Sequence, residues 1–115
     1  MTFELIKDFS GLEFFGNIPD TPNEVDERVE VFQLEESDWD ILDKDFVDPI
    51  NNLCNTLLDY GDVDFFNKEQ CSLLKSWLVD KLQQNLPARD KLLYSKLLDF
   101  ADQAIMMGTG IVIEL

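Results

Sequence analysis

The sequence contains no histidine, and it has only two cysteines among its 115 residues. Zinc and other transition-metal sites in proteins depend heavily on these two residue types, so the composition argues against such a site. The lack of histidine also removes the commonest general base and the usual activator of a serine or cysteine nucleophile. We therefore expect a protein that is not an enzyme and that needs no metal or cofactor.

Long apolar runs and a leader-like start are missing as well. No stretch approaches the roughly 20 apolar residues of a membrane-spanning helix. Residues 1–11 lack the basic, apolar and small-residue pattern of a signal peptide. We therefore expect a cytoplasmic protein that does not associate with membranes. Cys54 and Cys71 fall on apolar faces of predicted helices, so two buried thiols are expected. A disulfide between them is the geometrically allowed alternative if the two helices pack side by side.

Basic residues are scarce: nine lysines and arginines face 24 aspartates and glutamates, which gives a net charge of −15. The excess is uneven, because residues 20–48 hold twelve acids against two bases, a net charge of −10. Such a field repels nucleic acid and anionic membranes and accelerates encounters with a basic partner. Over the whole chain, negative charge also favours solubility. The local concentration is what predicts a binding role.

Apolar residues make up 45% of the chain and include nine phenylalanines, which is enough for a packed core. Residues 2–9 and 28–34 are expected to form strands. Residues 109–115 are apolar on both faces, which predicts a strand that is covered on both sides and central in its sheet. Residues 11–25 are rich in glycine, proline and asparagine and predict a loop, with Phe14 and Phe15 anchoring it to the core.

Apolar residues recur at helical spacing from residue 39 to residue 58. Ser37 is expected to cap the first helix. Asp48 and Pro49 are expected to restart it, because proline suits the first helical position, and Gly61 to stop it. The positions assigned to the buried face are Trp39, Leu42, Phe46, Val47, Ile50, Leu53, Cys54, Leu57 and Leu58.

Two further helices follow. Asn67 and Gln70 form the pattern of a capping box at the start of the first, and residues 85–87 end it. The second covers residues 88–107 and is ended by Gly108. The expected order is β–β–α–α–α–β. This predicts a single α+β domain, residues 1–115, in which three or four helices pack on a small sheet built from N-terminal strands and a C-terminal strand.

Three aspartates, Asp59, Asp62 and Asp64, surround Gly61 between two of the predicted helices. An EF-hand loop started at Asp59 or at Asp62 fails, because the required oxygen ligands and glycine do not fall at their positions. We interpret these acids as caps and solvated turn residues. A non-standard Ca²⁺ or Mg²⁺ site formed by some of Asp59, Asp62, Asp64 and Glu69 is the alternative.

The acids of residues 20–48 are expected to form one surface. In the first predicted helix, Asp38, Asp45 and Asp48 should project away from the apolar stripe, and other acids flank them. A rigid array of acids with aromatic neighbours can complement a basic protein surface. The predicted partner-binding residues are Glu36, Asp38, Trp39, Asp40, Asp43, Asp45 and Asp48.

In size, charge and layout the chain resembles the small acidic proteins that inhibit nuclease toxins or mimic DNA. The resemblance is one of profile and not of motif. The favoured hypothesis is a non-enzymatic binding module, an inhibitor or immunity-type protein, that presents an acidic surface to a basic protein partner. The alternative is a small regulatory or assembly subunit that binds through apolar helix surfaces and uses its charge only for solubility.

Overall fold

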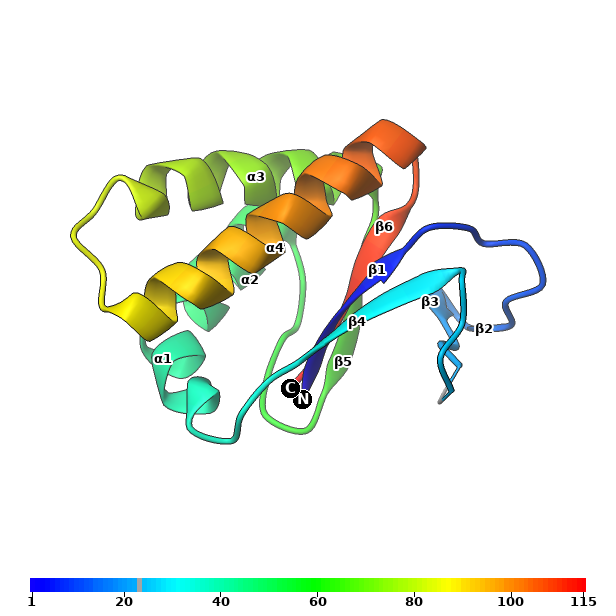
Figure 1. The fold of residues 1–115 in the computed structure, drawn as a ribbon, viewed down its shortest axis with the longest axis horizontal. Helices are drawn as coiled ribbons and strands as arrows, with labels where there is room; N and C mark the ends of the chain where they lie inside the picture. The colour runs from blue at the N-terminus through cyan, green and yellow to red at the C-terminus, as the bar shows by residue number, and fades with distance from the viewer. Residues whose placement is uncertain (23) are drawn as a thin grey trace.

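Four antiparallel strands form a sheet in the order β4–β1–β6–β5, and the helices cover one of its faces (Figure 1). The computed structural model describes residues 1–22 and 24–115. It confirms the predicted α+β architecture with N-terminal strands and a C-terminal strand in one sheet. The strands of the sheet are β1 (Thr2–Ile6), β4 (Val29–Gln33), β5 (Val63–Phe66) and β6 (Gly110–Glu114).

The C-terminal strand β6 lies between β1 and β5, as its apolar sequence predicts. Ile111 and Ile113 pack in the main core under the helices, whereas Val112 belongs to a smaller apolar cluster. All three side chains are buried because both faces of the strand are covered. The predicted central strand is confirmed.

The sequence patterns predicted the boundaries of the helices with differing accuracy. The capping box that starts α3 is confirmed: Asn67 Oδ1 accepts the Gln70 N–H at 2.9 Å, and Gln70 Oε1 accepts the Asn67 N–H at 2.9 Å. Gly108 ends α4 with a φ of +68°, the left-handed conformation predicted for it. The helices are α1 (Asp38–Asp45), α2 (Val47–Cys54), α3 (Lys68–Leu82) and α4 (Ala88–Met107).

Helix α2 stops six residues earlier than predicted. Asn55 adopts the left-handed conformation at φ 55°, so Asn55 and not Gly61 stops the helix. Leu58 is buried, but the Leu57 side chain is 83% exposed and Leu53 also faces solvent. The assignment of Leu53 and Leu57 to a buried helix face was therefore wrong. Ser37 holds the predicted cap position of α1 but makes no side-chain capping bond.

Residues 63–66, between α2 and α3, form β5, a strand that the sequence pattern did not predict. Asp64 lies in this strand, and its carboxylate accepts the Leu57 N–H at 2.8 Å and the Phe65 N–H at 2.9 Å. Asp59 accepts the N–H of Tyr60 at 2.7 Å. These two aspartates therefore accept hydrogen bonds from backbone N–H groups of the loop and of β5. Within residues 1–22 and 24–115, no three acidic or cysteine side chains are grouped so that they could hold a metal ion.

The second face of the sheet is partly covered by the segment between β1 and β4. Phe9 and Leu12 pack there against Ile6 and Val112. The short hairpin of β2 (Phe14–Phe15) and β3 (Ile18–Pro19) follows in this segment. The prediction that Phe14 and Phe15 anchor the loop to the core was wrong for Phe15, which is 74% exposed. Phe14 is 49% exposed and reaches only the smaller apolar cluster, through its ring contact with Phe9 at 6.0 Å.

The main core lies between the helices and the sheet. The rings of Phe46, Trp77 and Tyr94 contact one another, with centroids 5.6–6.1 Å apart, and join the junction of α1 and α2 to α3 and α4. Cys54 and Cys71 are both buried as free thiols, as predicted. Burial raises the pKa of the Cys54 thiol to about 11 and that of Cys71 to about 12. Neither thiol is therefore a reactive thiolate at neutral pH.

Membrane insertion finds no support in the helices. Among the residues described, none of the helices combines the length and the apolar character that crossing a bilayer requires.

Candidate functional site

The acids of the predicted surface lie in the turn before α1, on α1 and in the first turn of α2. Glu36, Asp40, Asp43 and Asp48 are exposed. Asp40 and Asp43 are three residues apart on α1, so they lie on one side of the helix. The α1 acidic surface is defined here by these exposed acids and the aromatic residue among them: Glu36, Trp39, Asp40, Asp43 and Asp48.

Asp38 does not belong to this surface, contrary to prediction. Its side chain is 0% exposed. The carboxylate accepts two hydrogen bonds from the Arg89 guanidinium, at 2.8 and 2.6 Å, and one from the Glu35 N–H at 2.8 Å. Asp38 reaches back to a backbone N–H three residues earlier, as in a capping box, and this turns its carboxylate inward. The bidentate pairing with Arg89 keeps it there.

The Asp38–Arg89 pair holds the start of α1 against the start of α4. The Arg89 guanidinium lowers the pKa of the Asp38 carboxyl below its usual value, and the hydrogen bond from Glu35 acts in the same direction. The pair joins residues 51 positions apart in the chain. It therefore fixes the segment that carries the α1 acidic surface to the rest of the fold.

Asp45, another predicted partner-binding residue, is only partly available. Its carboxylate lies 4.0 Å from the Lys81 ammonium of α3, and its side chain is 33% exposed. The Lys81 charge offsets part of the negative field at this end of α1. We therefore expect Asp45 to contribute less to binding than the exposed Asp40 and Asp43.

The sequence pattern did not point to Tyr60. This residue lies in the loop before β5, and its ring meets the Trp39 ring edge-to-face, with the two centroids 5.3 Å apart. Together with Glu36, Ser37 and Asp40, the two rings line a surface hollow of about 470 Å³. Tyr60 is 59% exposed. The one signal in the sequence that could have indicated Tyr60 is the position of an aromatic residue among acids in a predicted turn. Nothing in the sequence linked Tyr60 to Trp39.

The hollow combines two chemical features that suit an organic cation. The faces of Trp39 and Tyr60 attract a cation through their π-electrons, and the carboxylates of Glu36 and Asp40 supply charge and hydrogen-bond acceptors. An arginine side chain matches both features, because its planar guanidinium can stack on an aromatic ring and pair with a carboxylate. The site can therefore recognise a basic side chain without any catalytic group.

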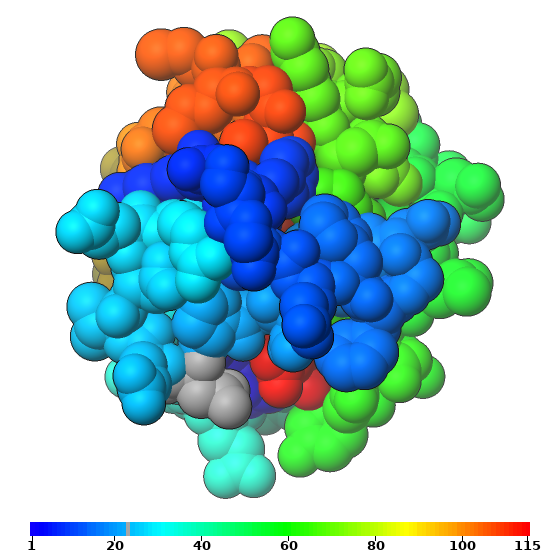
Figure 2. Space-filling view, turned by 90° about the vertical axis from the view of Figure 1, so that its right-hand side faces the viewer, coloured from blue at the N-terminus to red at the C-terminus, as the bar shows by residue number. Residues whose placement is uncertain are grey.

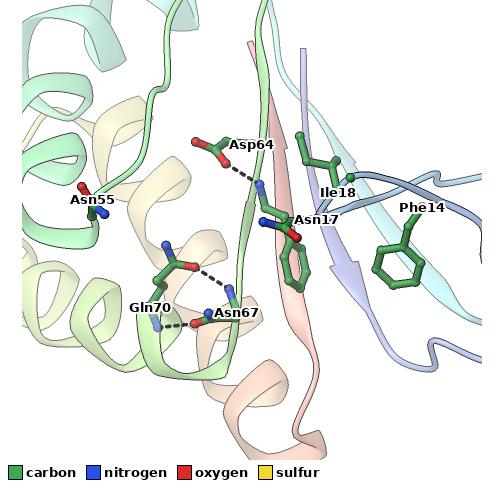
Figure 3. Close-up of a pocket in the computed structure, with 9 residues that line it drawn as sticks. Phe14, Asn17, Ile18, Asn55, Asp64, Asn67 and Gln70 are labelled. Atoms are coloured by element: carbon green, nitrogen blue, oxygen red, sulfur yellow. Dashed lines mark hydrogen bonds between the residues drawn. The ribbon is translucent and has the colours of Figure 1, made fainter.

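A second hollow, of about 490 Å³, lies between the β2–β3 hairpin and the junction of β5 and α3 (Figure 3). Amide side chains dominate its lining, including those of Asn17, Asn55, Asn67 and Gln70. Asn67 and Gln70 are already bonded to each other in the cap of α3, and the Gln70 amide also donates to the Cys54 carbonyl at 2.9 Å. These polar groups hold the fold together, so we assign no ligand to this hollow.

The chain was compared with protein-family models, curated proteins and solved structures, and none of them matches it. The functional argument therefore depends on the geometry and chemistry of the α1 acidic surface and of its hollow.

Proposed function

We propose that this protein is a non-enzymatic binding module that presents the α1 acidic surface to a basic protein, as an inhibitor or immunity-type antidote. Exposed carboxylates steer a basic partner toward the surface. The Trp39–Tyr60 hollow receives one of the partner's arginine or lysine side chains. The same charge repels nucleic acid and anionic membranes, so neither is proposed as a partner.

The observation that supports the proposal most directly is the contact between Trp39 and Tyr60 within a group of exposed carboxylates. Binding energy at protein interfaces is concentrated in a few aromatic and charged anchors surrounded by polar residues. Carboxylates that served only solubility would not need an aromatic hollow among them. The ion pair of Asp38 with Arg89 holds this group in place, which reduces the ordering cost of binding.

The alternative, a subunit that binds through apolar helix surfaces, has less support. The apolar stripes on which it depends are used inside the fold, since Ile50, Leu74, Leu78 and Leu97 are fully buried. The apolar side chains that helices α2, α3 and α4 expose, such as Leu53 and Leu92, are ordinary for a protein surface.

The proposal is tested by charge reversal with a matched control. The probe is the purified product of the gene next to the one that encodes this chain, titrated by calorimetry. Glu36→Lys/Asp40→Lys is expected to weaken binding by about 30-fold, because it places like charges opposite a basic surface. Asp80→Lys/Asp99→Lys makes the same change in charge at exposed positions of α3 and α4 and is expected to leave affinity within about threefold.

Salt provides the second readout of the same titration. Raising the ionic strength from about 0.05 to about 0.5 M should weaken binding of the unmodified chain steeply, since exposed charge pairs are screened. Equal losses in the two charge-reversed variants would contradict a localised site. A neighbouring product that is not basic, or that does not bind at low salt, would contradict the immunity-type form of the proposal.

A further inference from the structure

A third hollow lies on the face of the sheet that the helices do not cover. Figure 2 shows it as a recess in which the end of the chain, in red, lies between the blue β2–β3 hairpin and the green loop before β5. Its volume is about 210 Å³. The lining residues are Glu4, Phe15, Ile18, Pro19, Asp20, Thr21, Gly61, Val63, Val112 and Glu114.

Glu4 of β1 is the unusual member of this lining. It is only 6% exposed. Among the residues that the structure describes, its carboxylate receives one hydrogen-bond donor, the Thr21 hydroxyl, which lies 3.1 Å from each of its two oxygens. None of the lysine and arginine side chains in residues 1–22 and 24–115 forms an ion pair with it. A carboxylate can accept about four hydrogen bonds, so most of its capacity is unused.

A buried carboxylate without a cation is costly to the fold. Removing the charge from water is unfavourable, and a neutral hydroxyl compensates for only a small part of that cost. Burial raises the pKa of the Glu4 carboxyl, and the nearby Glu114 carboxylate adds to this effect. The α-ammonium of Met1 acts in the opposite direction and lowers the pKa of the Glu4 carboxyl, but it forms no ion pair with it. Among the described residues, Glu4 therefore has no cation within pairing distance. The other buried acid among the described residues, Asp38, avoids this cost because it is paired with Arg89.

We propose that this recess binds a small organic cation, a primary ammonium or guanidinium group on a short aliphatic chain, whose charge pairs with Glu4. The apolar side chains of Phe15, Ile18 and Val63 provide walls for the aliphatic part. Asp20 and Glu114 contribute two further carboxylates to the lining. The recess shares no lining residue with the Trp39 hollow, so this inference does not depend on the proposed function.

Two sources can supply this cation. It can be a free metabolite-sized amine or guanidine, or it can be the side chain of an arginine or lysine in another protein. The chemistry at Glu4 is the same in both cases. Agmatine represents the free cation, and a blocked glycine–arginine–glycine peptide represents the side chain. Binding of agmatine alone would identify a small-molecule site, and binding of the peptide as well would identify a side-chain pocket.

The test is a thermal-shift titration at constant ionic strength. At about ten times its dissociation constant, agmatine is expected to raise the melting temperature by about 5 °C. Butanol, which has an aliphatic chain but no charge, and an equal ionic strength of sodium chloride should cause no shift. In Glu4→Gln the shift should disappear, while the glutamine can still accept the Thr21 hydroxyl hydrogen bond.

Glu36→Gln is the matched control, because it removes one carboxylate from the Trp39 hollow and leaves the recess intact. A shift that persists in Glu4→Gln but disappears in Glu36→Gln would overturn this inference while supporting the α1 acidic surface as a cation site. Backbone amide NMR signals provide a readout that does not need a variant: those of Thr21 and Gly61 should move as agmatine is added. If neither moves, or if no probe shifts the melting temperature, the inference is wrong.

Discussion

Replacing Arg89 with methionine is expected to lower the free energy of unfolding by about 3–4 kcal/mol, because it leaves a fully buried carboxylate without its cation. Asp38 is 0% exposed and takes two of its three hydrogen bonds from Arg89. Methionine retains much of the aliphatic length of arginine, so the loss reports mainly on charge and hydrogen bonding. Urea denaturation followed by circular dichroism measures the change.

Replacing the other member of the pair, in Asp38→Asn, should lower the free energy of unfolding by less, about 2 kcal/mol. The reason is asymmetry in burial: the Arg89 side chain is 32% exposed and can remain solvated when its partner is lost, whereas Asp38 cannot. Lys91→Met, at an exposed position of the same helix, is the control and should change stability by less than about 0.5 kcal/mol. If Arg89→Met behaved like Lys91→Met, the pair would not hold α1 in place.

The contribution of the Asp38–Arg89 pair to the free energy of unfolding should decrease as the pH is lowered. The pKa of the Asp38 carboxyl is lower in the folded protein than its ordinary value of 3.8. Its stabilising effect is therefore fully present above pH 3.8 and is lost as the pH falls through the lower folded pKa. The difference in stability between the unmodified chain and Arg89→Met should accordingly narrow in strong acid.

Removing the indole ring, in Trp39→Ala, is expected to weaken binding of the basic partner by about 100-fold. The ring forms one wall of the 470 Å³ hollow and contacts Tyr60, so its loss removes both the cation–π surface and the contact that shapes the hollow. Calorimetry with the product of the neighbouring gene measures the effect. Trp39→Phe keeps an aromatic face and should recover part of the affinity.

Trp39 also packs against the main core, so a loss of affinity could reflect a loss of structure. Tyr60→Ala separates the two effects, because Tyr60 is 59% exposed and contributes little to the core. It should weaken binding by about tenfold with little change in melting temperature. Leu73→Ala, which removes an exposed apolar side chain on α3, is the control and should leave affinity unchanged. Equal affinity of Tyr60→Ala and the unmodified chain would contradict a role for the hollow.

The local signals in the sequence were sufficient for the part of the fold from residue 67 onward. Asn67 and Gln70 defined the start of α3, Gly108 defined the end of α4, and the apolar run after it defined a central strand. Each of these features depends on neighbouring residues, since caps and alternation patterns act over a few positions. Such features can therefore be read directly from the chain.

The features that were missed depend on contacts between distant residues or on competing local preferences. The apolar pattern continued to Leu57 and Leu58, but Asn55 took the left-handed conformation and ended α2. The strand β5 has only four residues and carries an aspartate, so it resembled a turn. It forms because it pairs with β6, about 50 residues later in the chain.

In the candidate site, too, features that depend on neighbouring residues were predicted and features that depend on distant contacts were missed. Helical spacing predicted that Asp38, Asp45 and Asp48 would project outward, but only Asp48 is exposed. The flanking acids Glu36, Asp40 and Asp43 are exposed as well. Asp38 was misplaced because its partner, Arg89, lies on another helix. The burial of Glu4 depends on the hairpin segment that folds over β1, which the strand pattern alone did not reveal.

The most direct test of the α1 acidic surface uses the two tryptophans of the chain, which give two indole N–H signals in a nitrogen-edited NMR spectrum. The probe is a short peptide in which arginine alternates with serine. We predict that the Trp39 signal moves saturably during the titration. The Trp77 signal should stay in place, because the Trp77 ring packs against Phe46 and Tyr94 and does not line the Trp39 hollow. The movement should be lost in Glu36→Lys/Asp40→Lys and kept in Asp80→Lys/Asp99→Lys. A Trp39 signal that does not respond, or that responds equally in both variants, would contradict the proposed recognition of a basic partner at this surface.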